Sequence, residues 1–319
     1  FVFLWTDLVL WLLAAGVLLY VRHVLRSANL RATWRQVAHN APAMCSAVVL
    51  LAFIALALLD SIHFRPKLPA VAATGAESAV AYATRTYSLL DVLLAHAIDA
   101  REKTYSAPLA YTSFQKETAI VDGQAVRGFP RLEFGGAHLT DPAAQWRNDI
   151  AWRSALGLSG GLAAALLLAL GVATIRARRL GEPTARSLAD LLAGHTDMPW
   201  RPMLVTAGLL LLFIGWIAAI WPAYHPFGTD RTGNDVLYQA IKSIRTGVVI
   251  GSLSTVATLP LAILLGVLAG YFKGWVDDAI QYFYTVLSSI PPVLLIAALV
   301  LLIQVWIDQN PQWFDTGLE

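Results

Sequence analysis

One polar stretch of this hydrophobic chain reads Phe227-Gly228-Thr229-Asp230-Arg231-Thr232-Gly233-Asn234-Asp235-Val236. The apolar run before it covers Met203 to Trp221, and the run after it covers Val248 to Tyr271. About 20 mostly apolar residues in a helix span the hydrocarbon core of a bilayer. The stretch is therefore predicted to be a short polar loop at one membrane surface, between two membrane-spanning helices.

Composition supports a membrane protein along the whole chain. Of its 319 residues, 57% are hydrophobic and 14% are charged, whereas soluble domains carry about 25% charged residues. The net charge of +2 gives no sign of a nucleic-acid partner, and lipid is the expected surrounding. The single cysteine, Cys45, cannot form an internal disulfide. Because the chain starts at Phe1 and stops at Glu319 soon after an apolar run, we expect both ends to be incomplete.

The hydropathy pattern predicts an all-α polytopic membrane protein with about six transmembrane helices and a small α+β extracytoplasmic domain. The candidate segments are Phe1 to Val21, Pro42 to Leu59, Trp152 to Ile175, Met203 to Trp221, Val248 to Tyr271 and about Ala279 to Ile307. Pro260, Pro291 and Pro292 are expected to break helices and to act as hinges, with ordinary kinks as the alternative.

Basic residues predict the orientation of these segments, because short cytoplasmic loops are enriched in Lys and Arg. Residues 22–41 contain four arginines and residues 176–202 contain five, so both are expected to be cytoplasmic. The loop at 222–247 and the region 60–150, which we call the cap, are then outside. The predicted organisation is two transmembrane helices (1–59), the cap (60–150), a third helix with a basic loop (151–202) and three further helices (203–319).

The cap is predicted to contain a helix over Ser78 to Ala100 and one or two short strands within Ala125 to Phe134. His96, Asp91 and Asp99 lie close together on the predicted helix. A metal or acid–base site is conceivable there, but a solvated helix face is the preferred interpretation because no third ligand or nucleophile has suitable spacing.

The polar loop itself contains turn and capping residues. Gly228 suits a turn after Pro226, and Gly233 suits a tight or positive-φ backbone. Thr229, Asp230 and Asp235 are predicted to accept hydrogen bonds from exposed backbone amides at helix starts. Val236 to Ile244 is expected to form a short helix along the outer interface.

These residues carry a resemblance to a known family. His225-Pro226-Phe227-Gly228-Thr229-Asp230 followed by Gly233 and Asp235-Val236, and later Ala269-Gly270-Tyr271-Phe272-Lys273-Gly274-Trp275-Val276-Asp277, resemble two motifs of the permease subunits of bacterial dipeptide/oligopeptide ABC importers. The resemblance covers about residues 201–305, with Asn234 and Lys273 as departures from the pattern. The cytoplasmic loop that contacts the ATPase in this family would follow the sixth segment and is not in this sequence.

The resemblance implies a multi-pass protein of the bacterial inner membrane that is not itself an enzyme and holds no cofactor. It implies ATPase subunits that bind ATP and Mg²⁺, a second permease subunit and a periplasmic substrate-binding protein as partners. The transported solutes would be peptides or similar small polar molecules. The loop at 225–245 and the cap would be the surfaces where the binding protein docks.

Two other classes compete with transport. The second and third segments flank the cap as in a membrane sensor or receptor with a periplasmic ligand-detecting domain. Such a chain should enter a signalling domain after Ile175, whereas 27 residues are followed by more membrane segments. An intramembrane hydrolase would need paired catalytic residues at membrane depth, and the sequence offers no Ser/His or Asp/Asp pair there.

Overall fold

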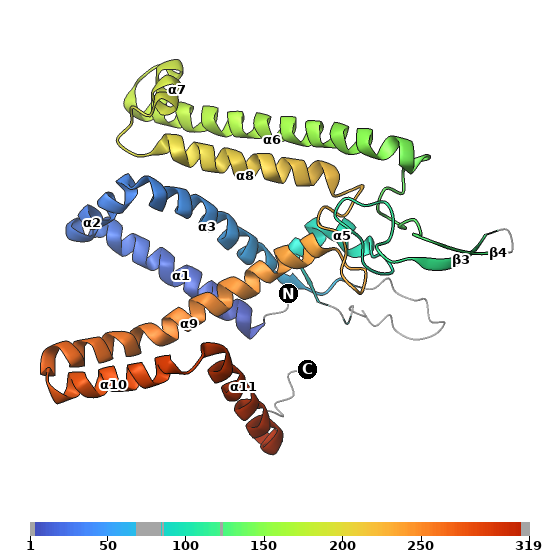
Figure 1. Ribbon diagram of the computed structural model, residues 1–319. Coiled ribbons are helices and arrows are strands. Elements are labelled where there is room, and N and C mark those ends of the chain that lie inside the picture. Colours follow the sequence, from blue (N-terminus) through green and yellow to red (C-terminus); the bar gives the residue numbers. More distant parts are fainter. Residues whose placement is uncertain (1–3, 68–83, 85, 122–123, 314–319) are drawn as a thin grey trace, which may run out of the picture. The chain divides into compact units, whose positions relative to one another are not determined.

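The computed structural model describes residues 4–67, 84, 86–121 and 124–313 (Figure 1). It is mostly helical and divides into two compact units, Phe1–Gly251 and Ser252–Glu319.

Within the described residues, six helices are long and apolar enough to cross a membrane. This agrees with the number of segments predicted from the sequence. They are α1 (Trp5–Arg26), α3 (Ala41–Asp60), α6 (Pro142–Leu180), α8 (Trp200–Ile220), α9 (Val236–Phe272) and α11 (Pro292–Gln309). The helix α6 is 39 residues long, so it extends well beyond the predicted third segment at both ends.

In the first unit, α1 and α3 are joined by α2 (Ala28–His39), which lies in the basic segment predicted to be cytoplasmic. The α3 helix starts where the Asn40 side chain accepts a hydrogen bond from the Ala43 amide (3.2 Å). Such a cap satisfies one of the amides that a helix leaves unpaired at its start. A small apolar core of Leu10, Ala57 and Val249 connects α1, α3 and α9.

The helices α6 and α8 run side by side and contact each other through glycines (Figure 1). A Cβ on Gly157 would lie 2.5 Å from the Gly215 carbonyl oxygen, and one on Gly161 would lie 2.6 Å from the Leu211 carbonyl oxygen. Small residues allow membrane helices to approach this closely. We call this contact the α6–α8 seam. The loop between the two helices contains α7 (Thr184–Ala193).

Between α3 and α6, the described part of the cap contains short elements only. The strands β1 (His63–Phe64) and β2 (Tyr87–Ser88) pair antiparallel, and so do β3 (Glu117–Val121) and β4 (Gln124–Gly128). The helix predicted over Ser78 to Ala100 is confirmed only in part. Tyr87 and Ser88 form β2, and the helical residues after them form two short helices, α4 (Leu89–Leu93) and α5 (Ala95–Asp99). Most of residues 78–85 lie outside the described residues. One or two short strands were predicted within Ala125 to Phe134, and of these residues Ala125 to Gly128 belong to β4.

The predicted interfacial helix over Val236 to Ile244 is not a separate element. These residues form the first turns of α9, which continues without interruption to Phe272. The break predicted at Pro260 is also wrong, because that residue lies inside α9. A proline removes one backbone hydrogen bond, and a long helix can retain its course around one such gap.

In the second unit, the end of α9 is followed by α10 (Trp275–Ser289) and α11. Lys273 and Gly274 form the turn before α10, both with positive φ. The predicted sixth segment is interrupted at Ile290 and Pro291, between α10 and α11. Neither helix has a buried residue among those that the structure describes.

Candidate functional site

The polar loop between α8 and α9 is shaped by Asp230. Its Oδ1 accepts hydrogen bonds from the backbone amides of Thr232 (2.8 Å) and Asn234 (2.9 Å). Burial by itself would raise the pKa of Asp230, but hydrogen bonds from Gln239, Thr232 and Asn234 lower it far below its usual range. Asp230 therefore closes a turn inside the loop and caps no helix, which corrects the capping role predicted for it.

The other predicted loop residues contact the cap. The Thr229 hydroxyl donates to the Thr104 carbonyl oxygen (2.8 Å) and lies 3.1 Å from Ser106 Oγ. Thr229 is therefore also not a helix cap. The Glu102 amide donates to the Gly233 carbonyl oxygen (2.9 Å). We call this contact between residues 101–109 and the loop at 225–235 the cap junction.

Two glycines make the cap junction possible. A Cβ on Gly233 would lie 1.7 Å from the Glu102 carbonyl oxygen, and one on Gly228 would lie 2.2 Å from the Ser106 carbonyl oxygen. Both glycines also have a positive φ, which side chains disfavour. The loop and the cap backbone can lie this close only because both positions lack a side chain.

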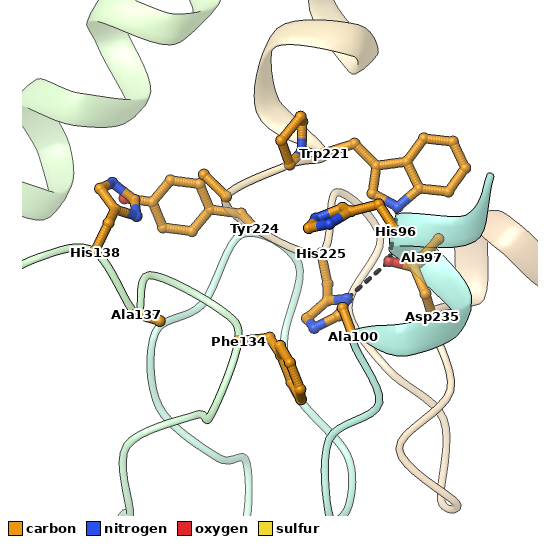
Figure 2. A pocket seen from close by; sticks show the side chains of 12 residues that line it. His96, Ala97, Ala100, Phe134, Ala137, His138, Trp221, Tyr224, His225 and Asp235 are labelled. Carbon is orange, nitrogen blue, oxygen red and sulfur yellow. Dashed lines mark hydrogen bonds and ion pairs between the residues drawn. The ribbon is translucent and has the colours of Figure 1, made fainter. Parts of the chain in front are cut away.

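Three charged side chains are buried at the centre of the cap junction: Glu102, His225 and Asp235. Asp235 Oδ2 lies 2.8 Å from His225 Nδ1, the contact dashed in Figure 2, and accepts a hydrogen bond from the Trp221 indole nitrogen (3.1 Å). Its other oxygen accepts the Tyr238 amide (3.0 Å) and so caps the start of α9. The helix-capping prediction for Asp235 describes this contact correctly but omits its ion pair with the histidine.

Glu102 lies on the opposite side of the histidine. Its carboxylate accepts the backbone amides of Glu133 (2.8 Å), Phe134 (2.8 Å) and Gly135 (2.9 Å). Its Oε1 is 3.5 Å from His225 Nε2, an ionic contact at the limit of hydrogen-bonding distance. The histidine ring thus bridges the loop and the cap.

The two carboxylates keep this histidine charged. Burial alone would lower the pKa of His225, but Asp235 and Glu102 raise it to about 9. Burial would raise the pKa of Glu102, whereas His225 and the three backbone amides lower it to about 2. At neutral pH the cap junction therefore contains a buried cation between two anions.

A cavity of about 210 Å³ borders this cluster (Figure 2). His96, Trp221, Tyr224, His225 and Asp235 are among its lining residues. His225 and Asp235 resemble an acid–base pair, but no serine, cysteine or lysine is among the described residues that line the cavity. Groups of His, Cys, Asp or Glu that could hold a metal ion are absent from the described part of the chain. The arrangement can bind and orient polar groups.

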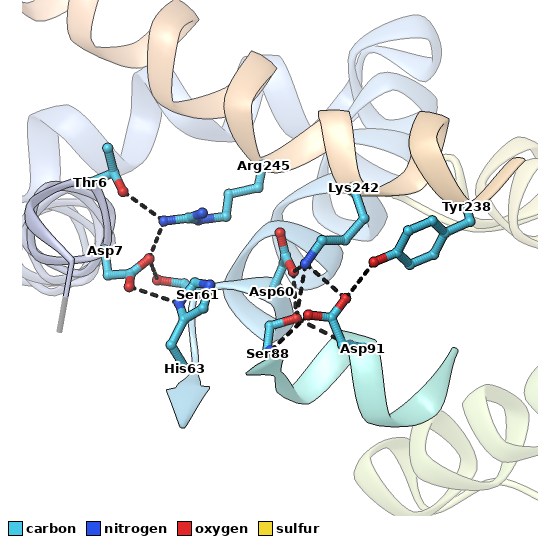
Figure 3. Close-up of polar contacts among 10 residues, drawn as sticks. All are labelled: Thr6, Asp7, Asp60, Ser61, His63, Ser88, Asp91, Tyr238, Lys242 and Arg245. Carbon is cyan, nitrogen blue, oxygen red and sulfur yellow. Dashed lines mark hydrogen bonds and ion pairs between the residues drawn. The ribbon is translucent and has the colours of Figure 1, made fainter. Parts of the chain in front are cut away.

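A second polar cluster joins the cap to the membrane helices (Figure 3). Lys242, in the second turn of α9, pairs with Asp60 at the end of α3 and with Asp91 of α4 (3.0 Å). Arg245, one turn further along α9, pairs with Asp7 of α1. Asp7 also contacts His63 Nδ1 (2.9 Å) and accepts the Ser61 hydroxyl (3.0 Å). We call this set the Lys242–Arg245 cluster.

This cluster corrects one sequence-based interpretation. Asp91 was expected on a solvated helix face, but it is buried and accepts the Tyr238 hydroxyl (2.9 Å) in addition to Lys242. Burial tends to raise the pKa of Asp91, and the Ser88 amide, Lys242 and Tyr238 lower it overall. His96 and Asp99 are exposed, as that interpretation expects.

Sequence reasoning did not identify Glu102, His225, Lys242 or Arg245 as parts of polar clusters. The partners of Glu102, Lys242 and Arg245 are distant in sequence: Lys242 and Asp60, for example, are 182 residues apart. His225 differs, because its partner Asp235 is ten residues away. The sequence contains one signal for the second cluster: Lys242 and Arg245 lie one helical turn apart, just before the apolar run that starts at Val248. A basic pair in that position requires acidic partners or water.

Comparisons with known proteins give partial matches to permeases. The chain is 37% identical over 64 residues to the peptidoglycan transport system permease protein YejE of Agrobacterium fabrum, covering 20% of this chain and 17% of that protein. It is 32% identical over 67 residues to the oligopeptide transport system permease protein OppC of Mycobacterium bovis and of Mycobacterium tuberculosis. That match covers 21% of this chain and 23% of each relative.

No family model and no solved structure matches the chain. The matched stretch spans less than a quarter of the curated relatives. The resemblance to ABC transport permeases that the sequence motifs indicate is thus confirmed over about one fifth of the chain. This resemblance and the six candidate membrane spans identify the chain as a multi-pass protein of the inner membrane that resembles transport permeases.

Proposed function

We propose that this chain is the permease subunit of an ATP-driven importer and forms part of the path for peptides or similar small polar solutes. The observation that carries the proposal is the similarity to two transport permeases, one named for peptidoglycan and one for oligopeptides. Such a subunit is not an enzyme. ATP and Mg²⁺ would bind to partner ATPase subunits inside the cell.

The exposed apolar helices support a partner within the membrane. Both α10 and α11 are apolar and have no buried residue among those described. In this proposal, they and the second half of α9 face lipid, a second permease subunit and the solute path. The break at Ile290 and Pro291 would be a hinge where the path opens and closes.

The cap junction supports a role for the outer face. It holds the cap to the start of α9 through buried charges and backbone hydrogen bonds. A binding protein that docks on the cap would therefore push on a membrane helix directly. Closure of the ATPase pair on the other side would shift the same helices between inward-facing and outward-facing states.

The test is purification of the full-length protein from its membranes in mild detergent, with its subunits identified by mass spectrometry. We expect an ABC ATPase in equal amount, with or without a second permease. Vesicles that contain the complex should hydrolyse ATP faster when the periplasmic binding protein and its solute are added.

A chain that purifies without any ATPase would overturn the proposal. The cavity beside the cap junction favours one alternative, a membrane receptor whose periplasmic domain detects a ligand. In that case, the cap would bind the ligand without any effect of ATP.

A further inference from the structure

A second cavity lies at the end of the α6–α8 pair away from the cap. It has a volume of about 420 Å³ and is bounded by the last turns of α6, the turn at 196–199 and the start of α8. Two arginines, Arg176 and Arg179, line it together with apolar side chains. None of these residues belongs to the cap junction or to the Lys242–Arg245 cluster.

One arginine atom in this cavity lacks a partner. Nη1 of Arg176 is buried and has no hydrogen-bond partner among the described residues. A buried guanidinium nitrogen without a partner costs free energy, because it has lost water and gained nothing in return. Asp197 also lines the cavity, yet no described ion pair joins it to Arg176. A ligand with anionic oxygens would satisfy the unpaired nitrogen.

The surroundings show where that ligand comes from. The predicted apolar run of α6 ends at Ile175, and Arg176 follows directly, so the cavity lies at the depth of lipid headgroups. Val172, Ile175 and Met198 supply an apolar side, and Trp200 at the start of α8 is a residue type common at the membrane interface. Basic pockets between membrane helices on the cytoplasmic side suit anionic headgroups.

We propose that this cavity binds one anionic phospholipid, with its phosphate on Arg176 and Arg179 and an acyl chain along Val172 and Ile175. Arginine suits a phosphate because its planar group donates two parallel hydrogen bonds. The site would tie the basic end of the α6–α8 pair to the anionic, cytoplasmic surface of the membrane. The inference rests on the chain being a membrane protein and does not depend on transport.

The experiment uses the full-length protein in detergent after its own lipids have been removed. Dioleoyl phosphatidylglycerol, dioleoyl phosphatidylcholine and inorganic phosphate are titrated separately, and bound lipid is counted by native mass spectrometry. We expect one phosphatidylglycerol to bind about tenfold more tightly than phosphatidylcholine. In a further titration, inorganic phosphate added at the same concentration as phosphatidylglycerol should not displace the lipid.

Matched variants locate the site. Arg176→Gln and Arg179→Gln should each weaken phosphatidylglycerol binding about tenfold. Arg178→Gln removes the same charge from the same helix, but Arg178 does not line the cavity. That control should change the affinity by about twofold or less. A melting curve in detergent shows whether each variant is folded.

Three results would overturn the proposal. An equal loss in Arg178→Gln would mean that general surface charge attracts the lipid. Equal binding of the two lipids would mean that the site recognises what both share, the phosphodiester and the acyl chains, and does not select an anionic lipid. Competition by inorganic phosphate would mean a site for free anions. The lipid comparison on the unmodified protein decides the question even if a variant fails to fold.

Discussion

The cap junction and the α6–α8 seam hold parts of the same unit together by opposite means. The cap junction buries three charged side chains, Glu102, His225 and Asp235, together with backbone hydrogen bonds. The seam brings two helices together where Gly157, Gly161 and Gly215 lack side chains. Both need glycine for close approach, but only the cap junction depends on ionisation. The comparison shows that a membrane protein can join its parts in two ways. Buried charges join the segments outside the membrane, and the close fit of glycine surfaces joins the membrane helices.

The largest effect is expected from removing the carboxylate at the centre of the cap junction. In Asp235→Ala, protonated His225 keeps only Glu102 as an ionic partner, at 3.5 Å, and α9 loses its N-terminal cap. Breaking a buried ion pair in this way should destabilise the cap junction by about 4 kcal/mol. Hydrogen exchange at the Glu102 and Gly136 amides, which bond to loop carbonyls, measures the opening.

The control for this change is Asp230→Ala in the same loop. Asp230 is only partly buried and holds a turn inside the loop, so its loss should cost about 1 kcal/mol. Similar, small effects of both substitutions would show that the buried pair contributes no more than an ordinary turn.

Next in size is the response of the cap junction to pH. The folded pKa of His225, about 9, lies above its ordinary value of 6.5. Its stabilising contribution is therefore full below pH 6.5 and is lost as the pH rises through 9. The loss should be on the order of 3 kcal/mol. Glu102 behaves oppositely: its contribution is full above pH 4.5 and is lost as the pH falls through about 2.

Hydrogen exchange of the Glu102 amide, corrected for the intrinsic pH dependence of exchange, measures this response. Protection should be greatest between pH 4.5 and 6.5. The variant His225→Gln should lose the alkaline decrease. An alkaline decrease that persists in this variant would assign the titration to another group.

Controls aside, the smallest effect is expected in the seam. Gly157→Ala places a Cβ 2.5 Å from the Gly215 carbonyl oxygen and 2.8 Å from Ala219 Cβ. Such overpacking should cost about 2 kcal/mol. Gly160→Ala is the matched control, because a Cβ there meets nothing within 4 Å. Thermal unfolding in detergent compares the two variants. Equal melting temperatures would mean that α6 and α8 can move apart at Gly157 without loss of stability.

Local patterns predicted the membrane helices well. The apolar runs appear in the structure as α1, α3, α6, α8, α9 and α11, because a run of about 20 apolar residues is a property of the chain itself. The same reasoning was only partly right over residues 86–100, where apolar spacing suggested one continuous helix. Contacts from α9 and the end of α3 instead favour a strand and two short helices, with Ser88 and Asp91 tied to Lys242.

The sequence by itself determined that this is a membrane protein resembling ABC permeases, and that its 225–236 loop contains turn residues. These are local properties of composition and of short motifs. Only the tertiary structure decided what the loop contacts. Gly233 suits a tight turn in any context, but its close approach to Glu102 depends on a cap segment more than 100 residues earlier in the chain. Long-range pairs of buried charge arise from folding, because burial selects partners that no local pattern specifies.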